Sequence, residues 1–226
     1  MKAAVWTKYG PPEVIQIREI AKPFPKDNEI LIKVKAASLS KADCEMRNLD
    51  FPPYIGIPLR LFAGIGKPKR IKVLGQELSG VVETVGKEVT QFEAGDEVMA
   101  STGFRMGAHA EYIRLPVNDE DTLIAKKPKN ISFKEAACIA ASGIEAFCFL
   151  KRAELQKGQH VMIIGAGGSF GTFAVQLAKF FGTLVTAVDT GPKLAFLKEL
   201  GADDVIDYTK TGYTDMDEKY DVIFII

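Results

Sequence analysis

The feature that most constrains the fold is the stretch VMIIGAGGSFGTFAVQLAKFFG, residues 161–182. An apolar run is followed by a group of glycines and then by helical spacing, which indicates a buried strand, a tight turn and a helix. The pattern G-x-G-x-x-G fails when it starts at Gly165, because a phenylalanine stands at its third glycine position. When it starts at Ala166, Gly168 and Gly171 fill the second and third positions, and a small residue still fills the first.

Small residues at these positions suit a loop that holds the pyrophosphate of a dinucleotide. Only a small residue lets the backbone approach the phosphates, and only a small residue lets the first helical turn lie close to the strand. The first helical residues, Ser169 and Phe170, then direct free N–H groups and a partial positive charge at the phosphates. On the glycines alone, a purely structural turn is an equally good interpretation, because such a trio is a weak signal.

The next strand strengthens the dinucleotide interpretation. The run TLVTAVD follows the helix and ends at Asp189, 18 residues after Gly171. An acidic residue about 20 residues beyond the glycines, at the tip of the second strand, accepts the ribose hydroxyls of NAD. Strand, glycines, helix, strand and acid together therefore favour a nucleotide site over a solvated strand end.

The chain changes character near residue 125, which predicts two domains over residues 1–125 and 126–226. The first part holds many short β-rich runs separated by turn residues, which is typical of a compact, partly barrel-like β domain. In the second part strands alternate with helices of about ten residues, which indicates βαβ units and a parallel sheet. Ser132, with Glu135 three residues on, has the spacing of a capping box at a helix start. The predicted fold class is therefore α/β.

One long segment, residues 49–70, is rich in proline, glycine and basic residues, which predicts an irregular surface loop. Its apolar residues leave two alternatives open. The segment covers a pocket, or it only packs against its own domain. These apolar residues are Phe51, Tyr54, Ile55, Leu59, Leu61 and Phe62.

Composition excludes several classes of partner. Lys plus Arg and Asp plus Glu number 29 each, so no overall charge attracts the chain to nucleic acid or to an anionic membrane. No run of about 18 apolar residues spans a bilayer, and the N-terminus lacks the apolar core of a signal peptide. The three cysteines show no CxxC spacing, which predicts reduced thiols in a cytoplasmic protein. We therefore expect no nucleic-acid partner and no membrane partner.

Five stretches occur in order along nearly the whole chain: EILIKVKAASLSKADCEMR, VLGQELSGVVETVGKEVTQFEAGDEV, GAHAEYIRLP, GAGGSFGTFAVQLAKFFG and LGADDVIDY. In these stretches the chain resembles the medium-chain dehydrogenase/reductase superfamily, in particular its zinc-independent, zeta-crystallin-like quinone oxidoreductase and enoyl reductase branch. The resemblance implies a GroES-like β domain followed by a doubly wound Rossmann domain, with NADPH or NADH bound between them. It also implies hydride transfer to a small-molecule quinone or α,β-unsaturated carbonyl.

The resemblance also places the zinc ligands of related alcohol dehydrogenases. They fall at Ser40, at Gln76 and near Ala141, where the side chains offer no thiolate, imidazole or carboxylate. We therefore expect no zinc. Without a Lewis acid a simple alcohol is a poor substrate, whereas a quinone or enone accepts hydride with the help of hydrogen bonds alone.

Catalytic roles for Ser40, Asp43 and Glu145 are implied by the resemblance, with departures from the branch. Asp43 matches an Asn-Pro-x-Asp run, while Ser40 replaces its asparagine and has a shorter reach to substrate. Glu145 replaces a threonine near the nicotinamide. A buried helix position for Ser40 and a surface position for Glu145 are equally good alternatives.

The residues expected to select between NADH and NADPH favour different cofactors. Asp189 favours NADH, because its carboxylate repels a 2′-phosphate. Lys193 and Tyr208 match positions that hold the 2′-phosphate in NADPH-using members of the branch, although a solvated lysine and a packed tyrosine are the structural alternatives. At short range the carboxylate dominates unless Lys193 neutralises it. The sequence therefore favours NADH slightly.

A complete Rossmann domain has six strands, and the fourth predicted strand, DVIFII, is the last of the chain. We therefore expect an incomplete Rossmann domain, in a fragment of a homodimeric reductase, with impaired activity of its own. Two alternatives are a metal-free alcohol or aldehyde reductase and a non-catalytic nucleotide-binding or structural member of the family.

Overall fold

The computed structural model describes residues 1–212 and 218–226. Contacts between residues divide the chain into two compact units, Met1–Ala141 and Ser142–Ile226. The division falls later than the boundary after residue 125 that the sequence predicts, and the packing of one helix of the first unit accounts for the difference.

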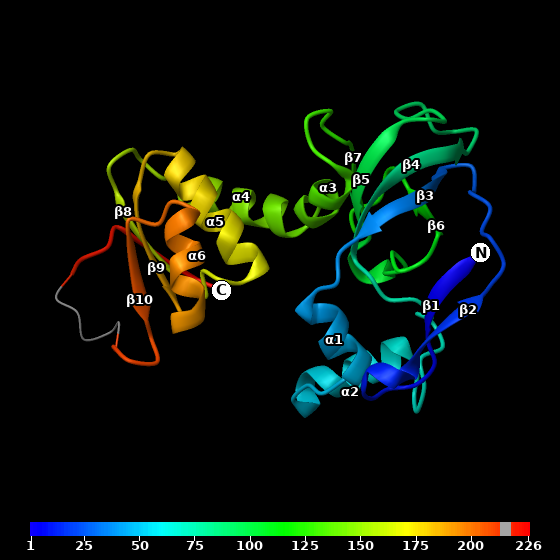
Figure 1. Ribbon diagram of the computed structural model, residues 1–226. Helices are drawn as coiled ribbons and strands as arrows, with labels where there is room; N and C mark the ends of the chain where they lie inside the picture. Colours follow the sequence, from blue (N-terminus) through cyan, green and yellow to red (C-terminus); the bar gives the residue numbers. More distant parts are fainter. Residues whose placement is uncertain (213–217) are drawn as a thin grey trace. The chain divides into compact units, whose positions relative to one another are not determined.

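The first unit is a β domain (Figure 1). Its strands are β1 (Lys2–Trp6), β2 (Ile15–Glu19), β3 (Glu29–Ala37), β4 (Glu77–Val85), β5 (Glu97–Ser101), β6 (Tyr112–Pro116) and β7 (Leu123–Lys126), with short 3₁₀ turns η1 (Pro12–Val14) and η2 (Gly103–Arg105). Five strands form an antiparallel sheet in the order β6-β3-β4-β5-β7, and β1 pairs with β2 in a separate antiparallel sheet. This topology confirms the predicted β domain.

The core of the five-stranded sheet follows from alternation along its central strands. Ile30 and Ile32 of β3 are fully buried, as are Leu78 of β4 and Val98 of β5. Ile32 lies opposite Val82 in the β3–β4 register, so their side chains share one face of the sheet. Burial of each such side chain stabilises the fold by about 1.5–3 kcal/mol.

Two helices separate β3 from β4, namely α1 (Lys41–Asn48) and α2 (Pro53–Ala63). The prediction of an irregular loop over residues 49–70 is therefore wrong for the part that forms α2. Pro53 suits the first helical position, because a missing N–H costs nothing where no acceptor exists within the helix. Pro58 lies inside the helix and removes only one further hydrogen bond, which the packing of α2 offsets.

That packing joins both helices to the N-terminal strands. Met46 of α1 and Ala63 of α2 are buried in one cluster with Trp6. Leu59 and Phe62 of α2 contact the same cluster from its edge. Phe51, Leu59 and Phe62 of the predicted loop thus pack against a second core of the domain, whereas Tyr54, Ile55 and Leu61 are exposed.

The helix α3 (Phe133–Ile139) belongs to the first unit. Ser132 and Glu135 form the predicted capping box, in which each side chain accepts from the other residue's N–H. Ser79 Oγ on β4 donates to the carbonyl oxygen of Phe133 at 2.5 Å. This contact spans more than fifty residues of sequence, which is why local patterns place the boundary too early.

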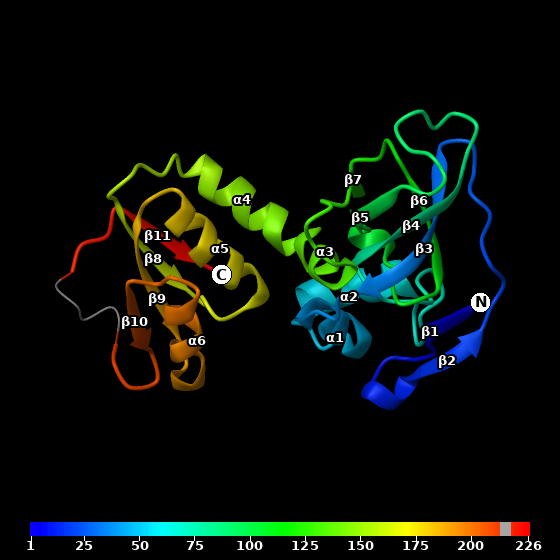
Figure 2. The ribbon, with the colours of Figure 1, turned by 45° about the horizontal axis from the view of Figure 1, so that its top comes forward.

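The second unit is a parallel sheet with helices (Figure 2). Its elements are α4 (Ser142–Arg152), β8 (His160–Ile164), α5 (Ser169–Phe180), β9 (Leu184–Asp189), the 3₁₀ turn η3 (Gly191–Lys193), α6 (Leu194–Glu199), β10 (Asp204–Asp207) and β11 (Val222–Ile225). The strands are parallel in the order β10-β9-β8-β11. This is the order 3-2-1-4 of the doubly wound fold, so the predicted partial Rossmann domain is confirmed.

Alternation along β8 separates the two faces of this sheet. Val161 and Ile163 are buried against Ala174 and Val175 of α5. Met162 points to the opposite face and joins a different cluster. Residues of α4 and α6 belong to the same cluster as α5, so all three helices cover one face of the sheet.

The start of α5 lies very close to the end of β8. A Cβ on Gly171, in the first turn of α5, would be 2.5 Å from the carbonyl oxygens of Gly165 and Ala166. Gly168 caps the helix and has more room, because the nearest atom to a Cβ there would be a carbonyl oxygen at 3.4 Å. The third small position of the motif therefore serves helix–strand packing.

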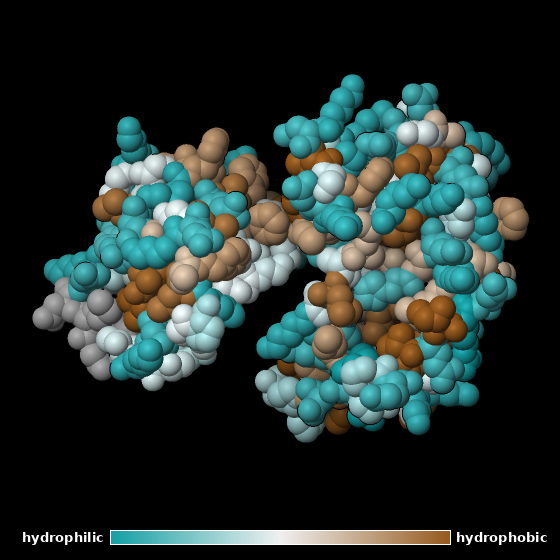
Figure 3. All heavy atoms as spheres, viewed as in Figure 1, coloured by the Kyte–Doolittle hydropathy of each residue, from teal (hydrophilic) through white to brown (hydrophobic). Residues whose placement is uncertain are grey.

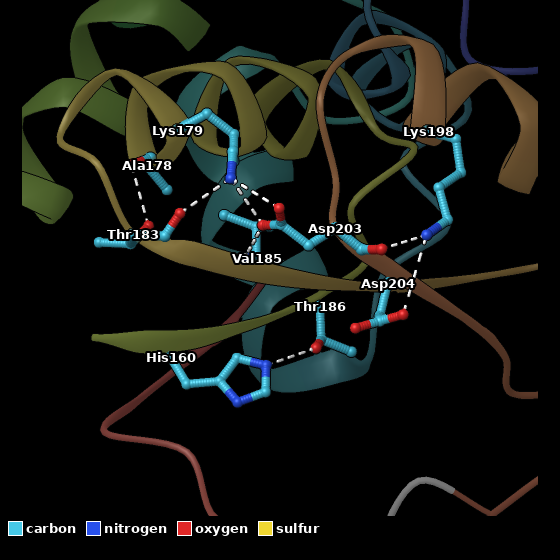
Figure 4. A network of polar contacts seen from close by, with 9 residues as sticks. All are labelled: His160, Ala178, Lys179, Thr183, Val185, Thr186, Lys198, Asp203 and Asp204. Carbon is cyan, nitrogen blue, oxygen red and sulfur yellow. Dashed lines mark hydrogen bonds and ion pairs between the residues drawn. The ribbon is translucent and has the colours of Figure 1, made fainter. Parts of the chain in front are cut away.

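Polar contacts join the end of α5 to β9 and to the turn before β10 (Figure 4). Lys179 Nζ donates to both carboxylate oxygens of Asp203, at 2.8 and 2.7 Å, and Val185 N–H donates to the same carboxylate at 2.6 Å. Partial burial acts to raise the pKa of the Asp203 carboxyl, but the hydrogen bonds from Lys179 and Val185 outweigh it and hold that pKa below its ordinary value. Nearby, His160 on β8 forms a hydrogen bond with the Thr186 hydroxyl on β9.

Serine substitutions at Gly171 and Gly168 should show which of the two glycines is needed for packing of α5 against β8. Gly171→Ser should lower the free energy of unfolding by about 1–3 kcal/mol, because backbone carbonyls must move to admit the Cβ. Gly168→Ser should change it by less than about 0.5 kcal/mol, because serine is a good N-cap residue. Urea denaturation measures both, and equal losses would show that Gly171 has no special packing role.

The carboxylate of Asp203 should contribute stability that depends on pH. Because its folded-state pKa is lowered, the contribution is present above the unfolded pKa of about 4 and is lost as pH falls through the folded value. At pH 7, Asp203→Asn should lower the free energy of unfolding by about 1 kcal/mol. The loss of unfolding free energy caused by Asp203→Asn should become smaller in acid. Asp204→Asn, which removes an exposed carboxylate, serves as control. A deficit that is constant with pH would contradict the assignment.

Candidate functional site

The candidate site lies at the carboxyl ends of β8, β9 and β10. In open parallel sheets ligands bind outside this edge. β8 ends at Ile164, and the loop of residues 165–168 leads directly into α5. The parallel register places Asp207 beside Asp189, so the ends of β9 and β10 meet at one level.

The N-terminus of α5 has the properties of an anion site. Gly168 caps the helix in an extended conformation, with φ −82° and ψ 169°. The N–H groups of Ser169, Phe170 and Gly171 have no acceptor within the helix, and the helix dipole adds a partial positive charge there. Ser169 Oγ donates to Ser142 Oγ at 2.8 Å, which ties this helix end to the start of α4.

Asp189 fastens the glycine loop to the end of β9. The residue is 4% exposed; its Oδ2 accepts the Gly167 N–H at 2.7 Å, and its Oδ1 accepts the Thr190 N–H at 2.8 Å. Burial acts to raise the pKa of the Asp189 carboxyl. Hydrogen bonds from Thr190, Lys193 and Gly167 outweigh burial and hold that pKa below its ordinary value. The carboxylate is therefore charged and already bound on both oxygens.

Lys193 supplies the countercharge. Its Nζ lies 3.1 Å from Asp189 Oδ1, four residues earlier in the sequence. A Cβ on Gly167 would collide with Lys193 Cδ, so the lysine side chain crosses directly over the glycine loop. The ion pair with Lys193 therefore reduces the net negative charge at the end of β9.

Tyr208 lies beside these residues, directly after β10. Its N–H donates to the Asp189 carbonyl oxygen at 3.3 Å, and its side chain is half exposed. The structure thus brings Asp189, Lys193 and Tyr208 together next to the glycine loop. Their individual roles in cofactor binding stay predictions.

Two residues of this site were missed by sequence reasoning. Gly167 and Thr190 hold the Asp189 carboxylate through their N–H groups. Gly167 belongs to the motif frame that starts at Gly165, which fails at its last position. No sequence pattern marks Thr190, because a backbone N–H carries no residue signature.

A second part of the site lies where β11 ends. A cavity of about 350 Å³ occurs here within the second unit. Phe170 stacks on Phe224 with ring centroids 5.6 Å apart, and Phe149 meets Phe170 edge-on at 5.9 Å. Glu145, predicted to lie near the nicotinamide, contributes a carboxylate to these mainly apolar walls. The lining residues are Glu145, Phe149, Phe170, Phe224, Ile225 and Ile226.

Ser40 and Asp43 belong to the first unit, where they start α1. They form a capping box: Asp43 Oδ2 accepts from Ser40 N–H and from Ser40 Oγ, each at 2.9 Å, and Asp43 N–H donates to Ser40 Oγ. Asp43 is buried, and its Oδ1 accepts the Gly75 N–H at 2.9 Å. Both predicted catalytic residues therefore have structural partners already, and catalytic roles for them stay predictions.

The positions that match zinc ligands hold other contacts. Gln76 Nε2 donates to the carbonyl oxygen of Gly103 at 3.3 Å, and Ala141 N–H donates to the Glu77 carboxylate at 2.9 Å. His109 forms a hydrogen bond with the carbonyl oxygen of Ser38. Over residues 1–212 and 218–226, no three His, Cys, Asp or Glu side chains are grouped so that they could hold a metal ion.

Comparison with protein families gives two matches. Residues 26–129 match the alcohol dehydrogenase GroES-like domain, and residues 170–224 match the zinc-binding dehydrogenase family. These matches fall on the β domain and on the parallel sheet.

Curated relatives cover the whole chain. The 2-methylene-furan-3-one reductase of Solanum lycopersicum is 34% identical over 99% of this chain and 56% of its own length. The chloroplastic NADPH-dependent alkenal/one oxidoreductase of Arabidopsis thaliana shows the same identity and coverage. The chain thus spans about half the length of these two relatives.

Solved structures extend the similarity to three dimensions. The quinone oxidoreductase from Coxiella burnetii is 31% identical to this chain, with a TM-score of 0.84. The similarity covers 99% of this chain and 67% of that one. The fold, the glycine loop and these relatives agree with the five stretches of the sequence. The chain belongs to the medium-chain dehydrogenase/reductase superfamily, among its quinone oxidoreductase-like members.

Proposed function

We propose that this protein is an NAD(P)H-dependent oxidoreductase that transfers hydride to a quinone or an α,β-unsaturated carbonyl. The observation that carries the proposal is the glycine loop at the N-terminus of α5, which Asp189 fastens to the end of β9. Unpaired helix N–H groups beside an open Gly168 suit a pyrophosphate. The printed names of the tomato, Arabidopsis and Coxiella relatives support the choice of hydride acceptor.

In this proposal the bound cofactor supplies the hydride, and the protein binds and orients it. Ala166, Gly168 and Gly171 shape the loop, while the N–H groups of Ser169 and Phe170 bind the pyrophosphate. The side chain of Phe170 also lines the cavity at the end of β11, whose stacked aromatic rings suit a flat, apolar ring. The loop and the cavity are therefore joined by one residue.

We further propose that the reaction needs no zinc. Ser40, Gln76 and Ala141 offer none of the donor groups that zinc prefers. The side chains of Ser40 and Gln76 also form hydrogen bonds within the protein. A quinone or enone needs only hydrogen bonds to stabilise the oxyanion that forms. In the proposal Ser40 Oγ donates that bond after release from Asp43, which acts as a positioning residue.

A non-catalytic nucleotide-binding protein is the second candidate, and Glu145 favours it. A carboxylate beside the nicotinamide would repel the negative charge that develops on a reduced carbonyl oxygen. Oxidation of NADPH or NADH with a panel of quinones and enones separates the two candidates. Turnover in a metal-free preparation supports the first candidate, whereas nucleotide binding without turnover supports the second.

For the cofactor we propose NAD(P)H, with NADH slightly favoured. The Asp189 carboxylate is charged and would repel a 2′-phosphate, but its ion pair with Lys193 reduces that repulsion. Lys193 and Tyr208 are both half exposed and both contact Asp189, so both are available to a phosphate. The name of the NADPH-dependent Arabidopsis relative supports use of NADPH in the family.

The proposal also covers the cellular location of the protein and its oligomeric state. We propose a cytoplasmic homodimer that binds a small-molecule substrate and no nucleic acid. The Arabidopsis relative is named as chloroplastic, so location differs among members of the family.

A side chain at Gly168 should block the cofactor without unfolding the protein. Gly168→Ser should weaken binding of both NADH and NADPH at least about tenfold, because the backbone no longer approaches the pyrophosphate. Isothermal titration calorimetry measures the two affinities. Gln176→Ala, two turns further along α5 on an exposed position, should leave both unchanged. Unchanged affinity in Gly168→Ser would refute the pyrophosphate site.

Loss of Lys193 should discriminate between the two cofactors. Lys193→Ala removes a cation from the 2′-phosphate position and leaves Asp189 unneutralised. The Kd for NADPH should therefore rise about tenfold more than the Kd for NADH. Lys198→Ala, on the same side of the sheet at α6, is the matched control and should affect neither. Equal changes for both cofactors would exclude contact between Lys193 and the 2′-phosphate.

A further inference from the structure

Residues 51–76 form a strongly one-sided stretch of charge in an otherwise balanced chain. They hold five basic residues and no acidic residue, while the whole chain has 29 of each sign. The prediction of no membrane partner rested on the whole-chain balance, which averages over this local excess. The five basic residues are Arg60, Lys67, Lys69, Arg70 and Lys72.

The helix within this stretch, α2, is apolar on two opposite sides. Leu59 and Ala63 face the cluster that buries Trp6. Tyr54, Ile57 and Leu61 are three and four residues apart, so they share the other face, and they are 77%, 58% and 65% exposed. A helix that is apolar all round is normally enclosed by protein or lipid. In this unit only one side of α2 is enclosed.

Neighbouring residues widen the exposed surface. Ile65, just past the helix, is 73% exposed, and Ile55 is also exposed. Figure 3 shows brown side chains at the surface of the first unit where Figure 1 draws α2. Exposed apolar patches of this kind mark interaction surfaces. The patch, here called the α2 face, comprises Tyr54, Ile55, Ile57, Leu61 and Ile65.

Hydrogen bonds hold the basic residues at the end of α2. The N–H groups of Lys69 and Arg70 both donate to the carbonyl oxygen of Ala63, at 2.8 and 3.2 Å. Tyr9 Oη donates to the carbonyl oxygen of Gly64 at 2.5 Å. The segment that carries four of the five cations is therefore fixed against the helix whose outer face is apolar.

Among the residues that the structure describes, these cations have no acidic partners. None of the five forms an ion pair with a carboxylate in the described ranges, although eleven ion pairs occur elsewhere there. Arg60 and Arg70 lie over the rings of Tyr9 and Phe62, at 5.4 and 4.1 Å, contacts that leave their charge uncompensated. The positive charge is thus available to an external anion.

We propose that the α2 face and the basic segment that follows it form a docking surface for an anionic membrane. The apolar side chains enter the boundary between headgroups and acyl chains, and the lysines and arginines bind the anionic headgroups. α2 has 11 residues, and no helix of the described ranges is long and apolar enough to cross a bilayer. The contact is therefore peripheral, with α2 lying in the plane of the interface.

A second copy of the chain fits this surface less well. A symmetric dimer places the same patch on both sides of the interface. Five unpaired cations would then face five identical cations, which is unfavourable in a desolvated contact. An anionic lipid surface combines the apolar layer and the opposite charge that this patch requires.

Sedimentation of the 226-residue chain with lipid vesicles tests the proposal. We expect binding to phosphatidylcholine vesicles that contain phosphatidylserine, and roughly tenfold weaker partition when salt rises from about 0.1 M to about 1 M. Failure to bind, or equal binding to phosphatidylcholine alone, would overturn the proposal. Dimerisation through Leu61 without vesicle binding, measured by light scattering, would overturn it in favour of a second copy.

Two variants separate the apolar and charged contributions. Tyr54→Ser with Leu61→Ser, and separately Lys67→Gln with Lys69→Gln and Lys72→Gln, should each weaken partition about tenfold. The matched controls should bind like wild type: Phe180→Ser, at an exposed site of the other unit, and Lys129→Gln with Lys134→Gln and Lys157→Gln, which makes the same change in net charge. Trp6 fluorescence verifies that the first unit is folded in each variant, since Trp6 lies in the cluster beneath α2, and circular dichroism verifies the second unit. If the controls lose as much binding as the variants, the α2 face is not the docking surface.

Discussion

The close approach of α5 to the end of β8 positions the rest of the candidate site. Because Gly171 has no side chain, the helix backbone reaches the carbonyl oxygens of Gly165 and Ala166. The N–H groups of the first helical turn are thereby held at the edge of the sheet where β9 and β10 also end. A helix displaced by the width of one methyl group would leave these N–H groups out of line with the loop that Asp189 fixes.

A buried carboxylate beside the glycine loop needs compensation. Asp189 receives it from two backbone N–H groups and from Lys193, and these contacts outweigh the effect of burial on its pKa. The carboxylate therefore has a structural task, to fix the glycine loop, beside the ribose-binding role that we propose for it. In the proposed function, cofactor choice depends on the Asp189–Lys193 pair as a unit, because a phosphate that attracts the lysine would also release the carboxylate.

The sequence predicted those elements whose pattern is local. The strands that became β8, β9, β10 and β11, the loop frame at Ala166 and the capping box at Ser132 all follow from short-range spacing. The contact of Ser79 with Phe133 joins distant parts of the chain, so the division by contacts falls later than the predicted boundary. The sequence indicated only that Lys193 could neutralise Asp189. Whether the ion pair forms depends on how the turn after β9 directs the lysine side chain.

The sequence predicted a loop where α2 forms for the same reason that the surface of α2 is unusual. Amphipathic periodicity reveals a helix only when one face is polar. Tyr54 and Leu61 on the outer side interrupt that signal, and two prolines with several glycines favour a loop in its place. With Lys or Glu at these positions, the periodicity would have predicted α2 as a helix. Water would then have hydrated its outer face. The apolar residues that hid the helix are the ones that the described part of the first unit leaves exposed.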